Sequence, residues 1–212
     1  MTIELVYADE HLLVLDKPSG LLAVPGRGAD KQDCLSARVQ ARYPDALIVH
    51  RLDMATSGLM VMARGPAAKR ALSKAFAARA VNKRYIAVVA GRLEAPPEEW
   101  GTIDLPIIAD WPNRPLRMID HQIGKPSVTR WRVLRCDEPG SNTRVELEPI
   151  TGRSHQLRLH LRELGYPILG DTLYAPPAIQ LMAGRLLLHA GSLRFVHPVT
   201  GEELAFECPA PF

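Results

Sequence analysis

The sequence predicts an α+β fold with a largely antiparallel sheet. Segments typical of helices and of strands are mixed along the 212 residues, without the regular alternation that parallel βαβ units require. The composition is that of a globular chain with a hydrophobic core, since 47% of the residues are hydrophobic and 23% are charged. We therefore expect a single domain over residues 1–212, with a mixed, mostly antiparallel central sheet flanked by helices and loops.

The strands are predicted from short apolar or alternating runs that end at turn-forming residues. They occupy 3–7, 12–15, 85–90, 128–134, 144–147, 186–188 and 192–196, and further apolar runs lie at 47–49 and 59–63. The segment 100–115 is rich in Pro and Trp, and we expect it to be irregular.

Three helices are predicted. The first covers 33–43 and is stopped by Pro44. The second covers 66–79, with Pro66 as its first residue and a high content of Ala, Lys and Arg. The third runs to Leu164, with Ser154 as its expected N-cap, leucines on one face and Gly165 at its end.

The three cysteines favour a reducing compartment. Cys34, Cys136 and Cys208 are far apart and odd in number, which argues against a disulfide framework and against a Cys-based zinc site. The sequence contains no apolar run near the ~18 residues that span a bilayer, and no visible export signal. We expect a cytoplasmic protein that does not bind membranes.

The charges are distributed unevenly, although the net charge is only +3. Residues 64–92 contain eight Lys or Arg and no Asp or Glu, whereas 94–110 contain five acids and no Lys or Arg. A second cluster comprises Arg153, Arg158 and Arg162. Such segregation is what a polyanion-binding face requires, and the alternative is an ordinary solvated helix face.

Asp53 is the main candidate for a catalytic group. It follows His50 and Arg51 at a polar break between two apolar runs, where catalytic side chains often lie, although the local pattern alone favours an ordinary turn or capping role. His155 and His160 are five residues apart, about 140° around a helix, and we expect no metal site there. The sequence has no nucleophile elbow, P-loop or dinucleotide fingerprint.

Six motifs in order carry a resemblance over essentially the whole chain. They are Lys17-Pro18-Ser19-Gly20-Leu21, His50-Arg51-Leu52-Asp53 with Thr56-Ser57-Gly58, Lys83-Arg84-Tyr85, Gly152-Arg153-Ser154-His155-Gln156-Leu157-Arg158, Gly170-Asp171-Thr172-Leu173-Tyr174 and Leu188-His189-Ala190. This set resembles the RluA family of RNA pseudouridine synthases. It implies a pseudouridine synthase fold and an isomerase that breaks the C1′–N1 bond of uridine in RNA and forms a C1′–C5 bond. The reaction needs no cofactor, metal or external energy source.

The resemblance also implies roles for individual residues. Asp53 corresponds to the catalytic carboxylate, which attacks the sugar or the base, or abstracts a ribose proton. Arg158 is the expected partner that keeps this partly buried carboxylate charged. Tyr85 corresponds to an active-site tyrosine that stacks on the extruded uracil. The residues expected to contact RNA are His50, Arg51, Lys83, Arg84, Trp111, Arg114 and Arg153.

Within that family, the closer likeness is to its dual-specificity members, which act on 23S rRNA and on tRNA. It rests on 50–58, on 110–115 and on 124–126. It implies rRNA and tRNA stem-loops as substrates, the anticodon stem-loop among them, and a role in rRNA and tRNA processing. No separate N-terminal RNA-binding domain and no obligatory protein partner are expected.

Two other functions compete with this interpretation. A glycoside or nucleoside hydrolase normally uses two carboxylates, whereas Asp53 lies among basic residues. A non-catalytic RNA-binding module needs the cations and aromatic residues but not Asp53.

Overall fold

The computed structural model describes residues 3–137 and 141–212, which divide into two units. Unit 1 contains Met1–Lys83 and His189–Pro211, and unit 2 contains Arg84–Leu188 together with Phe212. The expectation that 1–212 works as a single catalytic domain stays a prediction. Within the described residues, no helix is long and apolar enough to cross a membrane.

The strands of unit 1 form a mixed sheet in the order β1-β2-β4-β11-β12, with β3 paired to the end of β4. Among the described pairs of this unit, β4 and β11 run parallel, and the other pairs are antiparallel. The strands are β1 (Glu4–Ala8), β2 (Leu12–Lys17), β3 (Ala46–Ile48), β4 (Ser57–Arg64), β11 (Leu188–Val196) and β12 (Glu203–Glu207).

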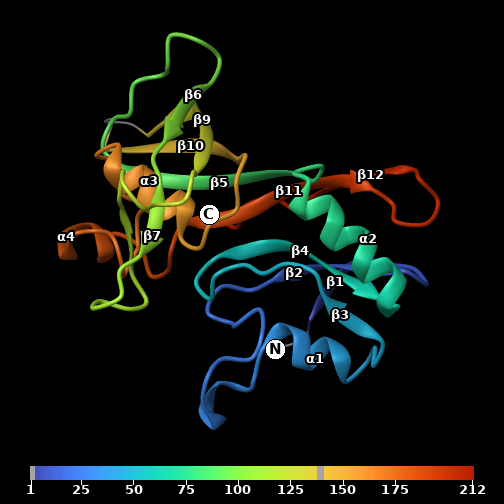
Figure 1. Cartoon of the computed structure of the whole chain (residues 1–212). Helices are drawn as coiled ribbons and strands as arrows, with labels where there is room; N and C mark the ends of the chain where they lie inside the picture. The colour runs from blue at the N-terminus through green and yellow to red at the C-terminus, as the bar shows by residue number, and fades with distance from the viewer. Residues whose placement is uncertain (1–2, 138–140) are drawn as a thin grey trace. The chain divides into compact units, whose positions relative to one another are not determined.

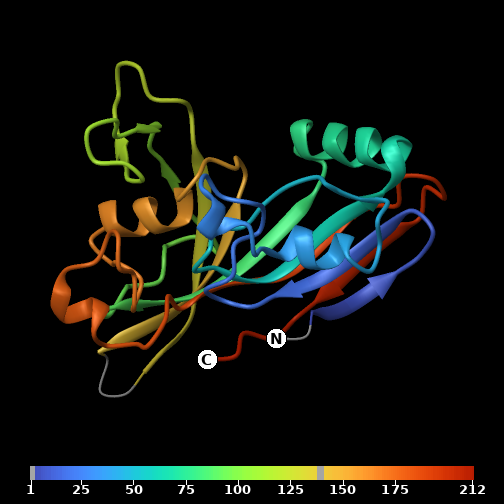
Figure 2. The same ribbon diagram turned by 90° about the horizontal axis from the view of Figure 1, so that it is seen from below.

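Strand β4 is buried on both faces. Its residues Leu59 and Val61 belong to the core that receives Ala68 and Leu72 of α2 (Gly65–Ala77), whereas the alternate residues of the strand point to the other face. Figure 1 shows α2 above these strands and α1 (Leu35–Gln40) below them, and α1 lies in front in Figure 2, the view from below. A short 3-10 helix, Ala29–Lys31, precedes α1. Helix α2 therefore packs on β4, helix α1 packs on the neighbouring β3, and the start of β4 is a fixed position in unit 1.

The parallel pairing of β4 with β11 requires a glycine at position 58. Gly58 has a φ of +110°, and a Cβ at this position would lie 2.3 Å from the carbonyl oxygen of Ala190. A side chain there would therefore push the two strands apart. This close approach sets Ser57 opposite His189 in the register.

The strands of unit 2 form an antiparallel sheet in the order β5-β10-β9-β6, and β7 and β8 form a separate two-stranded ribbon. Helix α3 (Gln156–Glu163) packs on β9 and β10, and Leu159 of α3 meets Ile107 of β7 in a small core. In Figure 2 the yellow-green ribbon lies beside the orange α3. The strands are β5 (Asn82–Ala90), β6 (Gly101–Asp104), β7 (Ile107–Ala109), β8 (Arg117–Ile119), β9 (Val128–Cys136) and β10 (Asn142–Pro149); α4 covers Pro177–Gln180.

The predicted strands and the three predicted helices are present, but four details of the prediction are wrong. Segment 100–115 contains β6 and β7 instead of being irregular, because β6 pairs with the distant β9. The strands predicted at 186–188 and 192–196 are one strand, β11. Helix α1 is shorter than 33–43, since Cys34 caps it by accepting a hydrogen bond from the Ala37 N–H. The N-cap of α3 is His155, with a φ of 59°, and not Ser154.

Candidate active site

Asp53 lies on the loop that connects β3 to β4 in unit 1, and a buried lysine anchors this loop. Lys17 is completely buried, and its ammonium group donates hydrogen bonds to the carbonyl oxygens of Pro18 (2.8 Å), Leu21 (2.7 Å) and Met54 (3.0 Å). The Gly20 N–H donates to the same Met54 oxygen at 2.9 Å. The backbone immediately after Asp53 is therefore fixed by the lysine motif of the N-terminal region.

Two further hydrogen bonds shape the same loop. Ser19 Oγ donates to the carbonyl oxygen of Ala55 at 2.7 Å. The Thr56 N–H donates to the Asp53 carbonyl oxygen at 3.1 Å, which closes a turn directly over the half-buried aspartate. The turn explains the polar break in the sequence, and it holds the Asp53 backbone on a rigid frame.

His50 fixes the other end of the loop as a neutral ring. Its Nε2 accepts a hydrogen bond from the Val61 N–H at 3.0 Å, and the ring stacks on Phe76 with the two centroids 4.4 Å apart. Burial is the main cause that lowers the pKa of His50 to about 3, and the positive charge of Lys83 is the smaller cause. Burial also lowers the pKa of Lys83. Arg51, between His50 and the aspartate, is exposed to solvent.

The start of β4 is joined to β11 by a buried side-chain contact. His189 Nε2 donates to the carbonyl oxygen of Cys208 at 3.0 Å, so that in the neutral ring Nδ1 accepts from Ser57 Oγ, 2.9 Å away. Both side chains are almost completely buried. This contact accounts for two of the sequence motifs, and it fixes the strand that follows the Asp53 loop.

Arg158 lies on α3 in unit 2 and forms a buried ion pair with Asp171. Its Nε donates to Asp171 Oδ2 at 2.8 Å and its Nη2 donates to Oδ1 at 2.5 Å. Asp171 Oδ1 also accepts the N–H groups of Leu173 (2.9 Å) and Tyr174 (3.1 Å), and the guanidinium carbon lies 5.2 Å from the centroid of the Tyr174 ring. The guanidinium is thus held on a fixed carboxylate. Asp171 lies in the motif that runs from Gly170 to Tyr174, but its contact with Arg158 was not predicted from the sequence.

The loop before α3 is held by Gln156. Its Oε1 accepts hydrogen bonds from Thr151 Oγ1 (2.7 Å) and from the Arg153 N–H (3.0 Å), and its Nε2 donates to the Val128 carbonyl oxygen at 2.9 Å. His155 Nδ1 lies 2.7 Å from the Tyr174 hydroxyl. This network sets the direction of α3, and therefore the position of Arg158.

The two histidines of this region have separate partners. His160 is buried between Thr129 Oγ1 (2.9 Å) and the Leu105 carbonyl oxygen (3.0 Å), and burial lowers its pKa, whereas His155 contacts Tyr174. In the part of the chain that the structure describes, no three His, Cys, Asp or Glu side chains are grouped so that they could hold a metal ion.

The remaining predicted residues of unit 2 lie in different environments. Tyr85 is half-buried on β5, opposite Leu147 of β10. Arg84 forms an ion pair with Glu146 at 3.2 Å and stacks on Trp100, so it is engaged within the sheet. Arg153, Trp111 and Arg114 are exposed, and the guanidinium carbon of Arg114 lies 3.3 Å from the centroid of the Trp111 ring. The catalytic and RNA-binding roles of all these residues stay predictions.

The fold and the motifs define an RNA-modifying enzyme. The sequence model described as RNA pseudouridylate synthase matches residues 11–163. The chain belongs to this family, and the predictions of an α+β pseudouridine synthase fold and of an isomerase that acts on uridine in RNA are confirmed.

Relatives match nearly the whole chain. It is 50% identical over 207 residues to the dual-specificity RNA pseudouridine synthase RluA of Yersinia pestis, covering 98% of both sequences. It is 49% identical over 209 residues to the protein of the same name from Escherichia coli strain K12, covering 98% of this chain and 93% of the relative. Among solved structures, human RNA pseudouridylate synthase domain containing 1 is 30% identical, with a TM-score of 0.80 and coverage of 100% of this chain and 84% of the other.

Proposed function

We propose that this pseudouridine synthase is dual-specific and modifies uridines in stem-loops of both 23S rRNA and tRNA, including the tRNA anticodon stem-loop. The observation that carries the proposal is the identity of about half of all residues to relatives named dual-specificity, over 98% of this chain. The matched region covers nearly the whole chain, loops included, and recognition of RNA rests on shape and on unstacked bases.

Asp53 is the proposed catalytic carboxylate. The bond between C1′ and N1 breaks, the base turns over, and C5 bonds to C1′; N1 gains a proton and C5 loses one. Asp53 acts on the bound uridine, either as a nucleophile at the sugar or the base or as the base that removes a ribose proton. Support comes from the loop frame, because Lys17 and His50 fix the backbone on either side of this carboxylate.

Tyr85 and Arg158 are proposed as the two catalytic residues that act together with Asp53. Tyr85 stacks on the extruded uracil, and Arg158 supplies the positive charge that favours an ionised carboxylate. The bidentate contact with Asp171 supports a positioned Arg158, since it holds the guanidinium in one orientation.

The proposed RNA contacts rest on cations that stay exposed. On and next to α2, Lys69, Arg70, Lys74 and Arg79 are all solvent-exposed, and they are proposed to contact phosphates. Arg51 is proposed to fill the position that the extruded base vacates, and exposed Arg153 to bind phosphate. The predicted RNA contacts of His50, Lys83 and Arg84 have weaker support, because these groups are packed or paired within the protein. Three free cysteines support a reducing cytoplasm as the place of action.

The test uses two RNAs transcribed with uracil tritiated at C5, one a 23S rRNA stem-loop and the other a tRNA. Isomerisation must release this hydrogen to water, whereas binding alone does not. Release from both RNAs, with pseudouridine found in each, is the expected result. Release from one RNA only contradicts dual specificity, and free uracil without pseudouridine indicates a hydrolase.

A further inference from the structure

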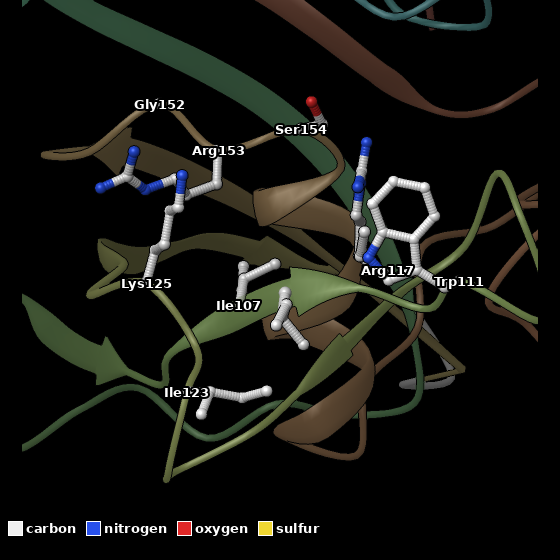
Figure 3. A pocket seen from close by; sticks show the side chains of 10 residues that line it. Ile107, Trp111, Arg117, Ile123, Lys125, Gly152, Arg153 and Ser154 are labelled. Carbon is white, nitrogen blue, oxygen red and sulfur yellow. The ribbon is translucent and has the colours of Figure 1, made fainter.

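We propose that unit 2 contains a preformed subsite for one unstacked nucleotide of the RNA, built by the β7–β8 ribbon and the loop before α3. The inference rests on the proposed function, because it names a part of the RNA substrate that the enzyme holds. The pocket has a volume of about 440 Å³, room for a single nucleotide but not for a duplex. Figure 3 shows its lining side chains, of which Ile107, Trp111, Arg117, Ile123, Lys125 and Arg153 matter here.

The floor of the pocket is apolar and partly open to solvent. Ile107 is buried, but Ile123 is 70% exposed and Trp111 is 67% exposed. Large apolar side chains that remain exposed beside a concavity are typical of binding sites. The Arg114 guanidinium lies on one face of the Trp111 indole, so the opposite face is the one on which a base can stack.

Cations form the rest of the pocket. Arg117, Lys125 and Arg153 line it, and the lining residues that the structure describes include no Asp or Glu. In Figure 3 Lys125 and Arg153 lie at one end of the pocket, and Arg117 lies beside Trp111 at the other. Arg117 Nε is buried and lacks a hydrogen-bond partner among residues 3–137 and 141–212. An anion is therefore the complementary ligand.

The acids nearest in sequence have other hydrogen-bond partners than these cations. Asp110 accepts hydrogen bonds from the backbone and side chain of Asn113, and Asp120 Oδ1 accepts the N–H groups of Gln122 (2.8 Å) and Ile123 (3.0 Å). Both carboxylates close turns and keep their charge, but within residues 3–137 and 141–212 neither forms an ion pair with Arg117, Lys125 or Arg153.

Backbone contacts place the cations before any ligand arrives. Lys125 exchanges two backbone hydrogen bonds with Ile107, at 2.9 and 3.0 Å. The Arg117 N–H donates to the Tyr174 hydroxyl at 2.9 Å, and the Arg153 N–H donates to Gln156 at 3.0 Å. An indole face beside cations carried on a fixed backbone fits a base with its phosphate, since phosphates bind cations and bases stack on aromatic rings.

The first experiment observes the Trp111 indole N–H by NMR in the full-length protein, with the signal assigned from Trp111→Phe. Uridine 5′-monophosphate should shift this signal in a saturable manner. The double variant Lys125→Ala/Arg153→Ala should weaken the affinity at least about tenfold, and Arg135→Ala, an exposed cation of β9 outside the pocket, should not. An equal response to inorganic phosphate, or to a hexaglutamate peptide, overturns the nucleotide assignment.

The second experiment separates this subsite from catalysis. The affinity of the Asp53→Asn protein is measured for a single-stranded hexauridylate and for the same oligonucleotide without bases. The oligonucleotide with bases should bind about 5- to 150-fold more tightly. Trp111→Ala should reduce that difference to the part that stacking on Tyr85 contributes, whereas Leu181→Ala, also exposed, should leave it unchanged. If the unchanged protein releases tritium from both RNAs while Trp111→Ala retains the whole difference, the subsite is wrong and the proposed function stands. If Trp111→Ala reduces the difference while the unchanged protein does not release tritium from both RNAs, the proposed dual specificity fails and the subsite stands.

Discussion

The buried ammonium group of Lys17 donates a hydrogen bond to the carbonyl oxygen of Met54, the residue that directly follows Asp53. A residue 37 positions away in the sequence thus holds the backbone of the proposed catalytic loop. Three carbonyl oxygens share this one ammonium, and its removal takes this donor from the oxygens of Pro18 and Leu21 and leaves the Met54 oxygen with the Gly20 N–H.

We therefore expect Lys17→Met to lower the free energy of unfolding by about 3 kcal/mol or more. Among molecules that remain folded, kcat should fall by about ten- to hundredfold because Asp53 is misplaced, with little change in KM for RNA. Urea unfolding and steady-state kinetics measure both effects, and Lys31→Met, at an exposed lysine, is the matched control. A destabilised variant with an unchanged kcat would show that Lys17 does not position the loop.

The Arg158–Asp171 pair predicts strong non-additivity. Removing one partner, in Asp171→Asn or Arg158→Met, leaves a buried group poorly compensated and should cost about 3–5 kcal/mol of stability. The double variant should cost clearly less than the sum of the two single variants, because neither charge of the Arg158–Asp171 pair is left without the other. Chemical denaturation of the four proteins gives the coupling energy; additive costs would mean that the two residues do not stabilise each other.

His50 predicts a pH dependence of stability. Its pKa is about 3 in the folded protein and about 6.5 in the unfolded chain, so between these values the unfolded state binds more protons. The stabilisation from His50 is complete above pH ~6.5 and is lost progressively as the pH falls toward 3. His50→Gln, which cannot titrate, should lose less stability between pH 7.5 and pH 5 than the unchanged protein in urea unfolding. Equal losses would contradict a neutral, buried His50.

Local patterns in the sequence predicted the fold class and most strands, and they placed Asp53 at a polar break between two strands, whereas its proposed catalytic role came from the family resemblance. These features depend on neighbours in the chain: the apolar runs around the β3–β4 loop, and the polar break closed by the Thr56 turn. The three-residue strands β7 and β8 were missed because so few residues show no periodicity, and the composition of 100–115 favours a loop.

Long-range contacts explain the features that the sequence did not predict. The segment Lys17-Pro18-Ser19-Gly20 has the composition of a solvent-exposed turn. The burial of Lys17 becomes favourable only because carbonyl oxygens from two loops accept hydrogen bonds from its ammonium group. Asp171 follows α3 by several residues, and no periodic pattern links it to Arg158. The charge cluster at 64–92 was visible in the sequence, but the ion pair that engages Arg84 involves Glu146 on another strand.

Replacement of Asp53 tests the central claim most directly. Asp53→Asn keeps the shape of the side chain and removes the carboxylate that acts on uridine. With RNA tritiated at uracil C5, this variant should bind as tightly as the unchanged protein but release no tritium above background and form no pseudouridine. Near-normal release by Asp53→Asn would contradict the assignment of Asp53 as the catalytic residue.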